Sequence, residues 1–214
     1  MLSKKVDFKK DYKDLYLPKT KPMLIDVPSM NFIMIDGAGD PSHTEYQQAL
    51  GILYALTFTI KMSKMGNNQP QGYYEYVVPP LEGLWWISGG AFSFDKRDNW
   101  LWTSMIRQPE FVTPDVFNWA LEECKRKKPE LDLRKARFET FSEGLCVQIM
   151  HIGPYSDEPR SIALLEDFIA ENGLLNQTGS QRKHHEIYLS DPRKTAPEKL
   201  KTVLRLPVSK IFEK

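Results

Sequence analysis

Apolar residues recur every three or four positions in three stretches of the chain, and this period predicts amphipathic helices. The three stretches cover residues 44–65, 114–128 and 156–172. The apolar stripe of the first consists of Tyr46, Leu50, Leu53, Tyr54 and Phe58. We expect Tyr54 and Phe58 to lie in the core between helix and sheet. Thr113 followed by Pro114 is a typical N-cap and first turn, so the second helix should begin there.

Shorter segments alternate in polarity or are rich in β-branched and aromatic residues, which favours strands. They cover residues 23–28, 31–36, 73–78, 84–88, 100–107, 137–141, 145–152, 185–190 and 202–207. In the segment 100–107, Trp100, Trp102, Ser104 and Ile106 should share one face. Gly89 and Gly90 would allow a bend or bulge.

The order of these elements repeats. Residues 31–107 and 146–208 both read strand, glycine-containing turn, helix, strand, strand, and they begin with the similar lines IMIDGAGDP and VQIMHIGPY. Duplicated βαββ units normally join into one antiparallel-rich sheet with helices on one face. We therefore predict an α+β fold with a ligand cleft near the junction of the repeats. Residues 1–22 should be an irregular lead-in, with at most one short helical turn, before a single domain at 23–214.

Composition excludes several classes of protein. The 214 residues carry 29 Lys and Arg against 28 Asp and Glu, so the basic excess of a nucleic-acid-binding protein is missing. No apolar run is long enough to span a membrane, and the N-terminus lacks the apolar core of a secretory signal. Cys124 and Cys146 stand far apart, which fits free thiols and a cytoplasmic location.

Signatures of common cofactors and catalysts are also missing from the sequence. The four histidines lack zinc-binding spacing, and no GxGxxG, P-loop or GxSxG motif occurs. We expect neither a metal nor a cofactor. Aromatic residues are abundant, with five Trp, nine Tyr and eleven Phe. These rings should serve a core or a pocket.

Three segments resemble a known family. HIGPYSDEPRSIALLEDFIAENG and HHEIYLSDPRKTAPEKLKTVLRLPV resemble the GyrI-like small-molecule-binding domain family, and EYVVPPLEGLWWISGG resembles its standalone subgroup of cyclopropanoid hydrolases. The wider family includes effector-binding domains of multidrug-responsive regulators and gyrase-inhibitory proteins. The resemblance implies the duplicated βαββ fold and an aromatic cleft with a buried carboxylate. Because no DNA-binding segment precedes Met23, we do not expect a transcription factor.

The resemblance puts Glu186 at the carboxylate position of the family. In an apolar cleft it would act as a general base or attract a lipophilic cation. A solvated carboxylate on an edge strand is the alternative. Tyr155, at the end of a Gly-Pro turn, would orient a water molecule or hydrogen-bond the ligand, or it is simply a packing residue.

Five further residues are candidates for binding a ligand, namely Trp85, Trp102, Tyr188, Glu82 and Trp119. Trp85 and Trp86 point to opposite faces of a strand, and the subgroup resemblance favours Trp85 as the ring in the cleft. Glu82 is as readily an exposed loop residue. Trp102 could line the cleft or fill the core, and the core is the better assignment for Trp119.

Two functions follow from the resemblance. The first is hydrolysis of an electrophilic cyclopropane ring in a planar aromatic xenobiotic, with Glu186 as the base. The second is binding or sequestration of lipophilic or cationic drugs without turnover. The sequence motifs favour the first.

Overall fold

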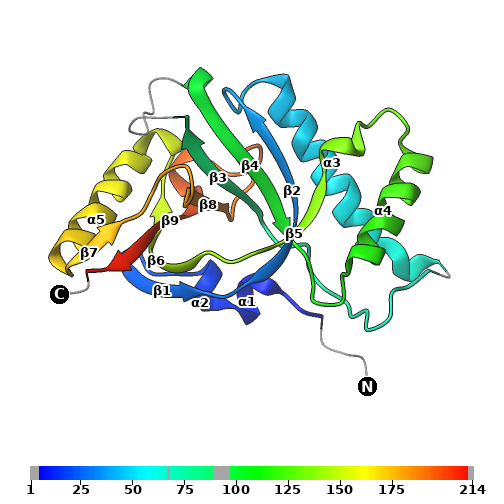
Figure 1. The fold of residues 1–214 in the computed structure, drawn as a ribbon, viewed down its shortest axis with the longest axis horizontal. Helices are drawn as coiled ribbons and strands as arrows, with labels where there is room; N and C mark the ends of the chain where they lie inside the picture. Colours follow the sequence, from blue (N-terminus) through cyan, green and yellow to red (C-terminus); the bar gives the residue numbers. More distant parts are fainter. Residues whose placement is uncertain (1–4, 67, 89–96, 212–214) are drawn as a thin grey trace.

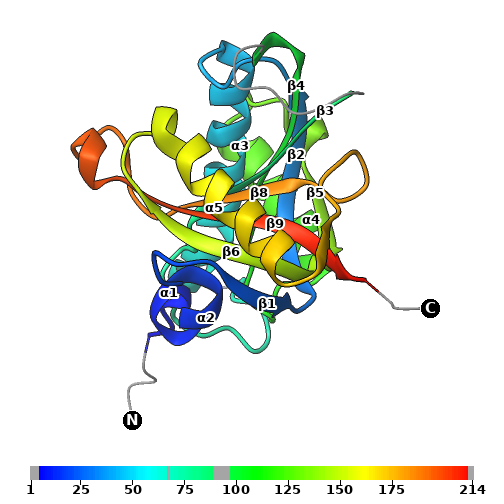
Figure 2. The same cartoon turned by 90° about the vertical axis from the view of Figure 1, so that its left-hand side faces the viewer.

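The computed structural model describes residues 5–66, 68–88 and 97–211. Its main feature is a strongly curled, half-barrel antiparallel sheet with helices against it (Figures 1 and 2). The strands are β1 (Met23–Val27), β2 (Met30–Ala38), β3 (Leu81–Ile87), β4 (Trp100–Arg107), β5 (Arg137–Phe141), β6 (Gly144–Ile152), β7 (Leu174–Asn176), β8 (His184–Tyr188) and β9 (Lys201–Lys210). The helices are α1 (Phe8–Asp11), α2 (Lys13–Tyr16), α3 (Thr44–Lys61), α4 (Pro114–Lys127) and α5 (Glu158–Glu171). Short 3-10 turns are η1 (Met62–Met65), η2 (Arg97–Asn99), η3 (Leu133–Lys135), η4 (Tyr155–Asp157) and η5 (Pro197–Lys199).

The strand order has an internal symmetry. The sheet reads β1-β6-β9-β8-β3-β4-β2-β5, with β7 added beside β9. Outward from the central β8–β3 pair, one half contains β8, β9 and β6 and the other contains β3, β4 and β2. Within each half, the central strand is the second of the three along the chain, the next is the third and the outermost is the first. Helix α3 connects β2 to β3, and α5 leads from β6 toward β8. The two halves therefore meet at the β8–β3 pair, and side chains of both lie close together there.

The larger helices cover one face of the sheet. Rings and aliphatic groups of α3 and α4 pack with Trp85 and Trp102, and α5 packs on Val147 and Leu204. In Figure 1, α5 lies at one end of the sheet and α3 at the other, with β8 and β3 between them. The region above the central strands is thus bordered by two helices.

Helices α1 and α2 cover the opposite face, contrary to the expectation of an irregular lead-in and helices on one face only. Phe8, Leu15 and Tyr16 in α1 and α2 are buried against Leu84 and Ile187 of the central strands. Leu84 is adjacent to Trp85 in β3, so the two side chains lie on opposite faces. Aromatic residues at the N-terminus supply the apolar surface that makes this packing favourable.

Most predicted elements match the structure closely. Strands β4 and β5 have the predicted limits, and α4 starts at Pro114 with the Thr113 hydroxyl accepting a hydrogen bond from the Val116 amide (3.3 Å). Trp100, Trp102 and Ile106 share the face that packs on α3, as their alternation predicted. Strand β7 was not predicted. The predicted bend at Gly89 and Gly90 lies outside the described residues.

Two further predictions were wrong. Tyr54 and Phe58 are 38% and 46% exposed, because α3 buries the side that carries Leu53, Leu56 and Ile60 instead. Residues 73–78 are not a strand; Tyr76 makes an isolated bridge with Val6. This segment is fixed by ring packing of Tyr76 on Phe8 rather than by a ladder of hydrogen bonds.

Candidate functional site

Strand β8 presents its side chains alternately to the two faces of the sheet. Glu186 and Tyr188 face the side covered by α3 and α5, whereas His185 and Ile187 face the N-terminal helices. The partner of Glu186 across the β8–β3 ladder is Gly83. The candidate carboxylate therefore lies at the junction of the two halves of the sheet, opposite a residue without a side chain.

Glu186 is buried and hydrogen-bonded. Tyr188 donates its hydroxyl proton to Glu186 Oε2 (2.7 Å), and His184 Nε2 lies 3.1 Å from Oε1. The whole residue is 8% exposed, which excludes the solvated edge-strand alternative. Burial and the carboxylates of Glu186 and Glu158 raise the pKa of Tyr188 well above its usual value, so this phenol stays protonated and keeps donating.

The indole of Trp85 lies over Gly83 and completes this arrangement. Trp85 Nε1 donates to the Tyr188 hydroxyl (3.0 Å), which in turn donates to Glu186. A Cβ at position 83 would lie 2.8 Å from Trp85 Nε1 and 3.2 Å from the Tyr188 hydroxyl. The indole can occupy this position because residue 83 is glycine. Trp86, on the other face, lies under the ammonium group of Lys183.

Further rings surround this chain of hydrogen bonds. Tyr46 of α3 packs on Trp85 (centroids 5.8 Å apart) and edge-on against Trp102 (5.0 Å). Tyr155 meets Tyr188 edge-on at 6.0 Å and is 36% exposed. Trp102 is fully buried above Gly37, so it is a core residue behind the site. Among the predicted rings, Tyr155 is partly exposed to solvent, and Tyr188 contacts both Tyr155 and the Glu186 carboxylate.

A second carboxylate, Glu158, lies on the same face and was not predicted. It is the first residue of α5, just after the turn that carries Tyr155, and it is only 3% exposed. Its charge and that of Glu186 are close enough to interact, and the Thr202 hydroxyl of β9 lies beside it. His151 fixes this turn through contacts with Ser161 Oγ (2.9 Å) and the Pro154 carbonyl oxygen (3.2 Å).

Burial raises the pKa of Glu158 well above its ordinary value, and the nearby charge of Glu186 raises it further. The helix N-terminus favours the ionised form by about 0.3–1 kcal/mol. Burying an unpaired carboxylate costs several kcal/mol, so burial outweighs the helix dipole. Glu158 therefore holds its proton to a higher pH than an exposed glutamate does. No sequence spacing indicated this, because acidic residues in the first turn of a helix are usually solvated.

Glu82, a predicted ligand-binding residue, lies on the opposite face of the sheet. It is buried, accepts a hydrogen bond from Tyr16 (3.2 Å) and lies 3.0 Å from His185 Nε2. His185 Nδ1 contacts Glu143 Oε2 (3.0 Å), which also accepts a hydrogen bond from Arg205 (2.8 Å). Glu82 thus belongs to a buried ion cluster of Glu82, Glu143, His185 and Arg205 and is separated by the sheet from Glu186.

This ion cluster holds the N-terminal helices to the sheet. Arg205 also donates to the Leu15 carbonyl oxygen (2.9 Å), and Gln148 donates to the Asp14 carbonyl oxygen (2.7 Å). The two flanking carboxylates raise the pKa of His185 to about 9 against the opposing effect of burial. The His185 imidazolium and Arg205 together balance the two carboxylates, and the cluster is structural rather than open to a ligand.

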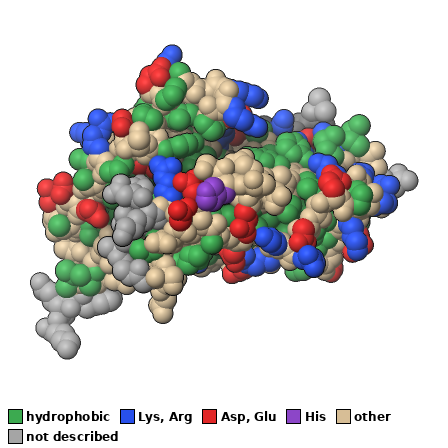
Figure 3. Space-filling model, turned by 90° about the horizontal axis from the view of Figure 1, so that it is seen from above, with side chains coloured by type: hydrophobic (Ala, Val, Ile, Leu, Met, Phe, Trp, Pro, Cys, Tyr) green, Lys and Arg blue, Asp and Glu red, His purple; other side chains and the backbone are tan. Residues whose placement is uncertain are grey.

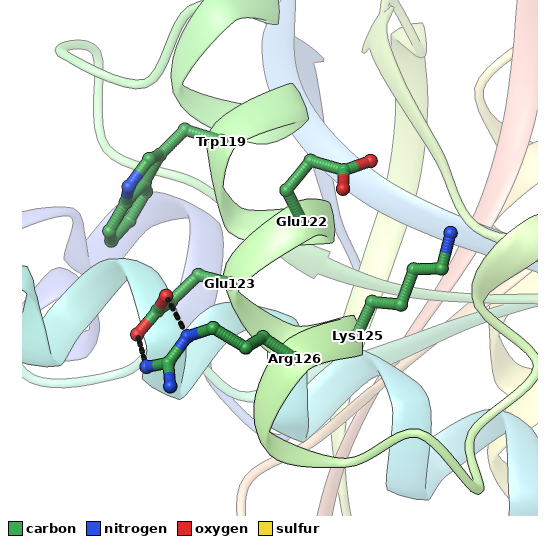
Figure 4. A pocket seen from close by; sticks show the side chains of 5 residues that line it. All are labelled: Trp119, Glu122, Glu123, Lys125 and Arg126. Atoms are coloured by element: carbon green, nitrogen blue, oxygen red, sulfur yellow. Dashed lines mark hydrogen bonds and ion pairs between the residues drawn. The ribbon is translucent and has the colours of Figure 1, made fainter.

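Trp119 lies apart from the other candidates. It is half-buried on α4, which packs chiefly against α3, and it borders a surface depression of about 470 Å³. Figure 4 shows the five lining side chains, all from α4, with Arg126 paired to Glu123 (2.9 Å). The depression beside Trp119 is open to solvent and contains the Arg126–Glu123 ion pair, and it therefore differs from the buried site at Glu186.

The upper surface in Figure 3 carries mixed charges. Acidic and basic side chains are interspersed there, so the coloured residues present no extended basic area for nucleic acid. Within residues 5–66, 68–88 and 97–211, no group of three or more His, Cys, Asp or Glu side chains is arranged to hold a metal ion. Among the helices of the described segments, none is long and apolar enough to cross a membrane.

The curled antiparallel sheet with a buried, ring-covered carboxylate at its centre defines a small-molecule-binding domain. The chain belongs to the GyrI-like small molecule binding domain family, whose sequence model matches residues 20–209. No protein of curated function matches it.

Similar structures have been solved, among them the following three. A crystal structure of an uncharacterized conserved protein from Listeria innocua is 56% identical over 96% of this chain and all of that chain, with a TM-score of 0.93. A hydrolase from Listeria innocua is 54% identical over the same shares, with a TM-score of 0.89. The EcmrR C-terminal domain is 11% identical over 89% of this chain and 98% of that domain, with a TM-score of 0.56, so it supports the fold alone.

Proposed function

We propose that this protein is a hydrolase that opens electrophilic cyclopropane rings of planar aromatic xenobiotics by adding water, with Glu186 as the general base. The observation that carries the proposal is the buried Glu186 carboxylate, held by Tyr188 beneath aromatic rings at the junction of the two sheet halves. The 54% identity to a protein described as a hydrolase supports an enzyme. In this proposal the two halves of the sheet are copies of one βαββ unit within a single domain.

Ring opening needs a base, a donor and a platform for the flat substrate. Glu186 takes a proton from water as the water oxygen bonds to the ring carbon. The strained carbon–carbon bond breaks, and its electron pair moves into the conjugated carbonyl group of the substrate. Burial and the charges of Glu158 and Glu186 raise the pKa of Tyr155 to about 12, so its phenol stays protonated and orients the water. The rings of Tyr155 and Tyr188 would contact the substrate.

The test is direct. Purified protein is incubated with a duocarmycin-type spirocyclopropane, and mass spectrometry measures the product that has gained one water. Loss of a general base lowers rates by roughly 10²–10⁴-fold, so Glu186→Gln should lose at least 100-fold. Glu166→Gln, an exposed carboxylate on α5, serves as the control and should keep the wild-type rate. Unchanged substrate, or equal rates for Glu186→Gln and wild type, would refute the assignment.

Binding without turnover is the second candidate. A carboxylate among ring faces attracts lipophilic cations, and the Tyr188 and Trp85 hydrogen bonds already hold Glu186 in place without a substrate. A planar cationic dye should then quench tryptophan fluorescence saturably and remain chemically unchanged. Glu186→Gln should weaken that quenching, whereas Glu82→Gln, behind the sheet, should affect stability but not the affinity of the folded protein.

A further inference from the structure

The Glu158 carboxyl group has an unusual combination of burial and missing partners. Although Glu158 is 3% exposed, its Oε1 atom has no hydrogen-bond partner among the described residues. A buried polar atom is almost always satisfied by protein, water or a ligand. Glu158 Oε1 is therefore available to a molecule that enters the site.

The groups around Glu158 come from four elements. Glu158 interacts electrostatically with Glu186 and Tyr188 of β8 and with Tyr155 of η4 in the preceding turn, and the Thr202 hydroxyl of β9 lies beside it. Arg97 of η2 contributes a weaker positive charge, and its guanidinium is already within 3.9 Å of Asp40. The charge that affects Glu158 most strongly is thus the like charge of Glu186, which favours a proton on Glu158.

We propose that Glu158 is the acid of this site, a second carboxyl group that donates its proton to an oxygen atom of the ligand while Glu186 accepts one. This deepens the proposed hydrolysis and rests on it. In this proposal Glu158 carries its proton before the reaction begins. Two like carboxyl groups in different environments commonly divide acid and base roles in this way.

The step balances without a further reagent. The water oxygen bonds to the ring carbon and its proton passes to Glu186. The ring carbon–carbon bond breaks, its electron pair moves through the conjugated system to the carbonyl oxygen, and that oxygen takes the Glu158 proton. The product is a phenol with a new alcohol. Transfer of the proton from Glu186 to Glu158 restores the resting pair.

This assignment narrows the substrate class. The ligand must present a hydrogen-bond-accepting oxygen to Glu158 and an electrophilic carbon to water at Glu186. A conjugated cyclopropyl ketone meets both needs, whereas an alkyl cyclopropane lacks the acceptor. The structure therefore assigns specificity to the electron-accepting carbonyl group as well as to the flat ring system.

Turnover provides the first test. Glu158→Gln keeps the side-chain shape but has no acidic proton, so kcat should fall at least 100-fold while KM changes less than threefold. Wild-type kcat should decline at high pH as Glu158 loses its proton, and Glu158→Asp should retain part of the rate with a shifted decline. Glu166→Gln should match wild type in all three respects. Turnover by wild type with an equal rate for Glu158→Gln overturns the role of Glu158 and leaves that of Glu186 standing.

Infrared difference spectroscopy gives a readout that is independent of hydrolysis. Wild type minus Glu158→Gln at pH 7 should contain the carbonyl band of a protonated carboxylic acid, displaced in deuterium oxide. Wild type minus Glu166→Gln should lack this band of a protonated acid. If no substrate is hydrolysed, the proposed reaction fails, yet a protonated band at Glu158 still supports a proton donor facing the ligand. Absence of that band overturns the inference in either case.

Discussion

Replacing Gly83 with alanine tests whether the arrangement above Glu186 depends on the missing side chain. A Cβ there would lie 2.8 Å from Trp85 Nε1 and 3.3 Å from Trp85 Cε2. Favourable contacts of carbon atoms lie near 3.5–4.0 Å, so the indole must move by about 0.7 Å. That movement lengthens the 3.0 Å hydrogen bond from Trp85 to Tyr188.

The cost can be estimated from these contacts. Overpacking of a well-packed region costs about 1–3 kcal/mol, and a weakened buried hydrogen bond adds about 1 kcal/mol. We therefore expect Gly83→Ala to lower the free energy of unfolding by about 2–4 kcal/mol. For a chain of this size, each kcal/mol lowers Tm by roughly 2–4 °C, which predicts a fall of about 4–16 °C.

Urea unfolding followed by tryptophan fluorescence measures this change, and thermal unfolding provides Tm. Gly51→Ala is the matched control, since Gly51 lies inside α3 and a Cβ there meets no atom within 4 Å. Alanine in a helix interior is more favourable than glycine by about 0.5–1 kcal/mol, so this variant should be more stable than wild type. The reasoning is refuted if Gly83→Ala unfolds like wild type with an unchanged emission spectrum, or if both variants lose stability equally.

Two other predictions concern the ion cluster and α4. The pKa of His185, raised to about 9, exceeds the value of about 6.5 in an unfolded chain, so the folded state holds a proton that the unfolded chain releases between these pH values. This stabilisation is complete below pH 6.5 and is lost as pH rises through 9. Urea titrations should therefore show that the free energy of unfolding declines over that window in wild type and declines less in His185→Gln. Parallel curves for the two proteins would contradict this role of His185. Thr113→Ala removes the side-chain acceptor of the Val116 amide and should lower the free energy of unfolding by about 1 kcal/mol. Thr113→Ser keeps a hydroxyl and should lose little stability. Equal losses in the two variants, measured by chemical denaturation, would mean that the hydroxyl does not cap the helix.

Regular local patterns were sufficient to predict much of the fold. The alternation of Trp100, Trp102 and Ile106 predicted β4 and its buried face, and Thr113-Pro114 predicted the start of α4. The buried side of α3 was missed because apolar residues occur on more than one side of this helix. The side of α3 that is buried depends on the position of α4 and the sheet. The spacing of apolar residues within α3 does not reveal that position.

The residues of the candidate site were likewise predicted only in part. The resemblance led to Glu186, Tyr188, Trp85 and Tyr155, and the structure brings these four residues together. Glu82 was misplaced because a strand residue faces one side or the other according to register, which the sequence leaves open. Glu158 was missed because its burial arises from the crossing of α5 over β9, a contact between distant parts of the chain.

Successive side chains of β8 lie in two different charged environments, one on each face of the sheet, and this favours a single register of β8 with its neighbouring strands. A one-residue slip that puts Glu186 in the place of His185 would bring His185 under the tyrosine and tryptophan rings and would crowd Glu186 against Glu82 and Glu143. Three carboxylates would then meet behind the sheet with Arg205 but without the imidazolium that now lies between two of them. The misaligned strand is penalised on both faces at once. The ion cluster behind the sheet consequently helps to keep the strand partners of β8 in place.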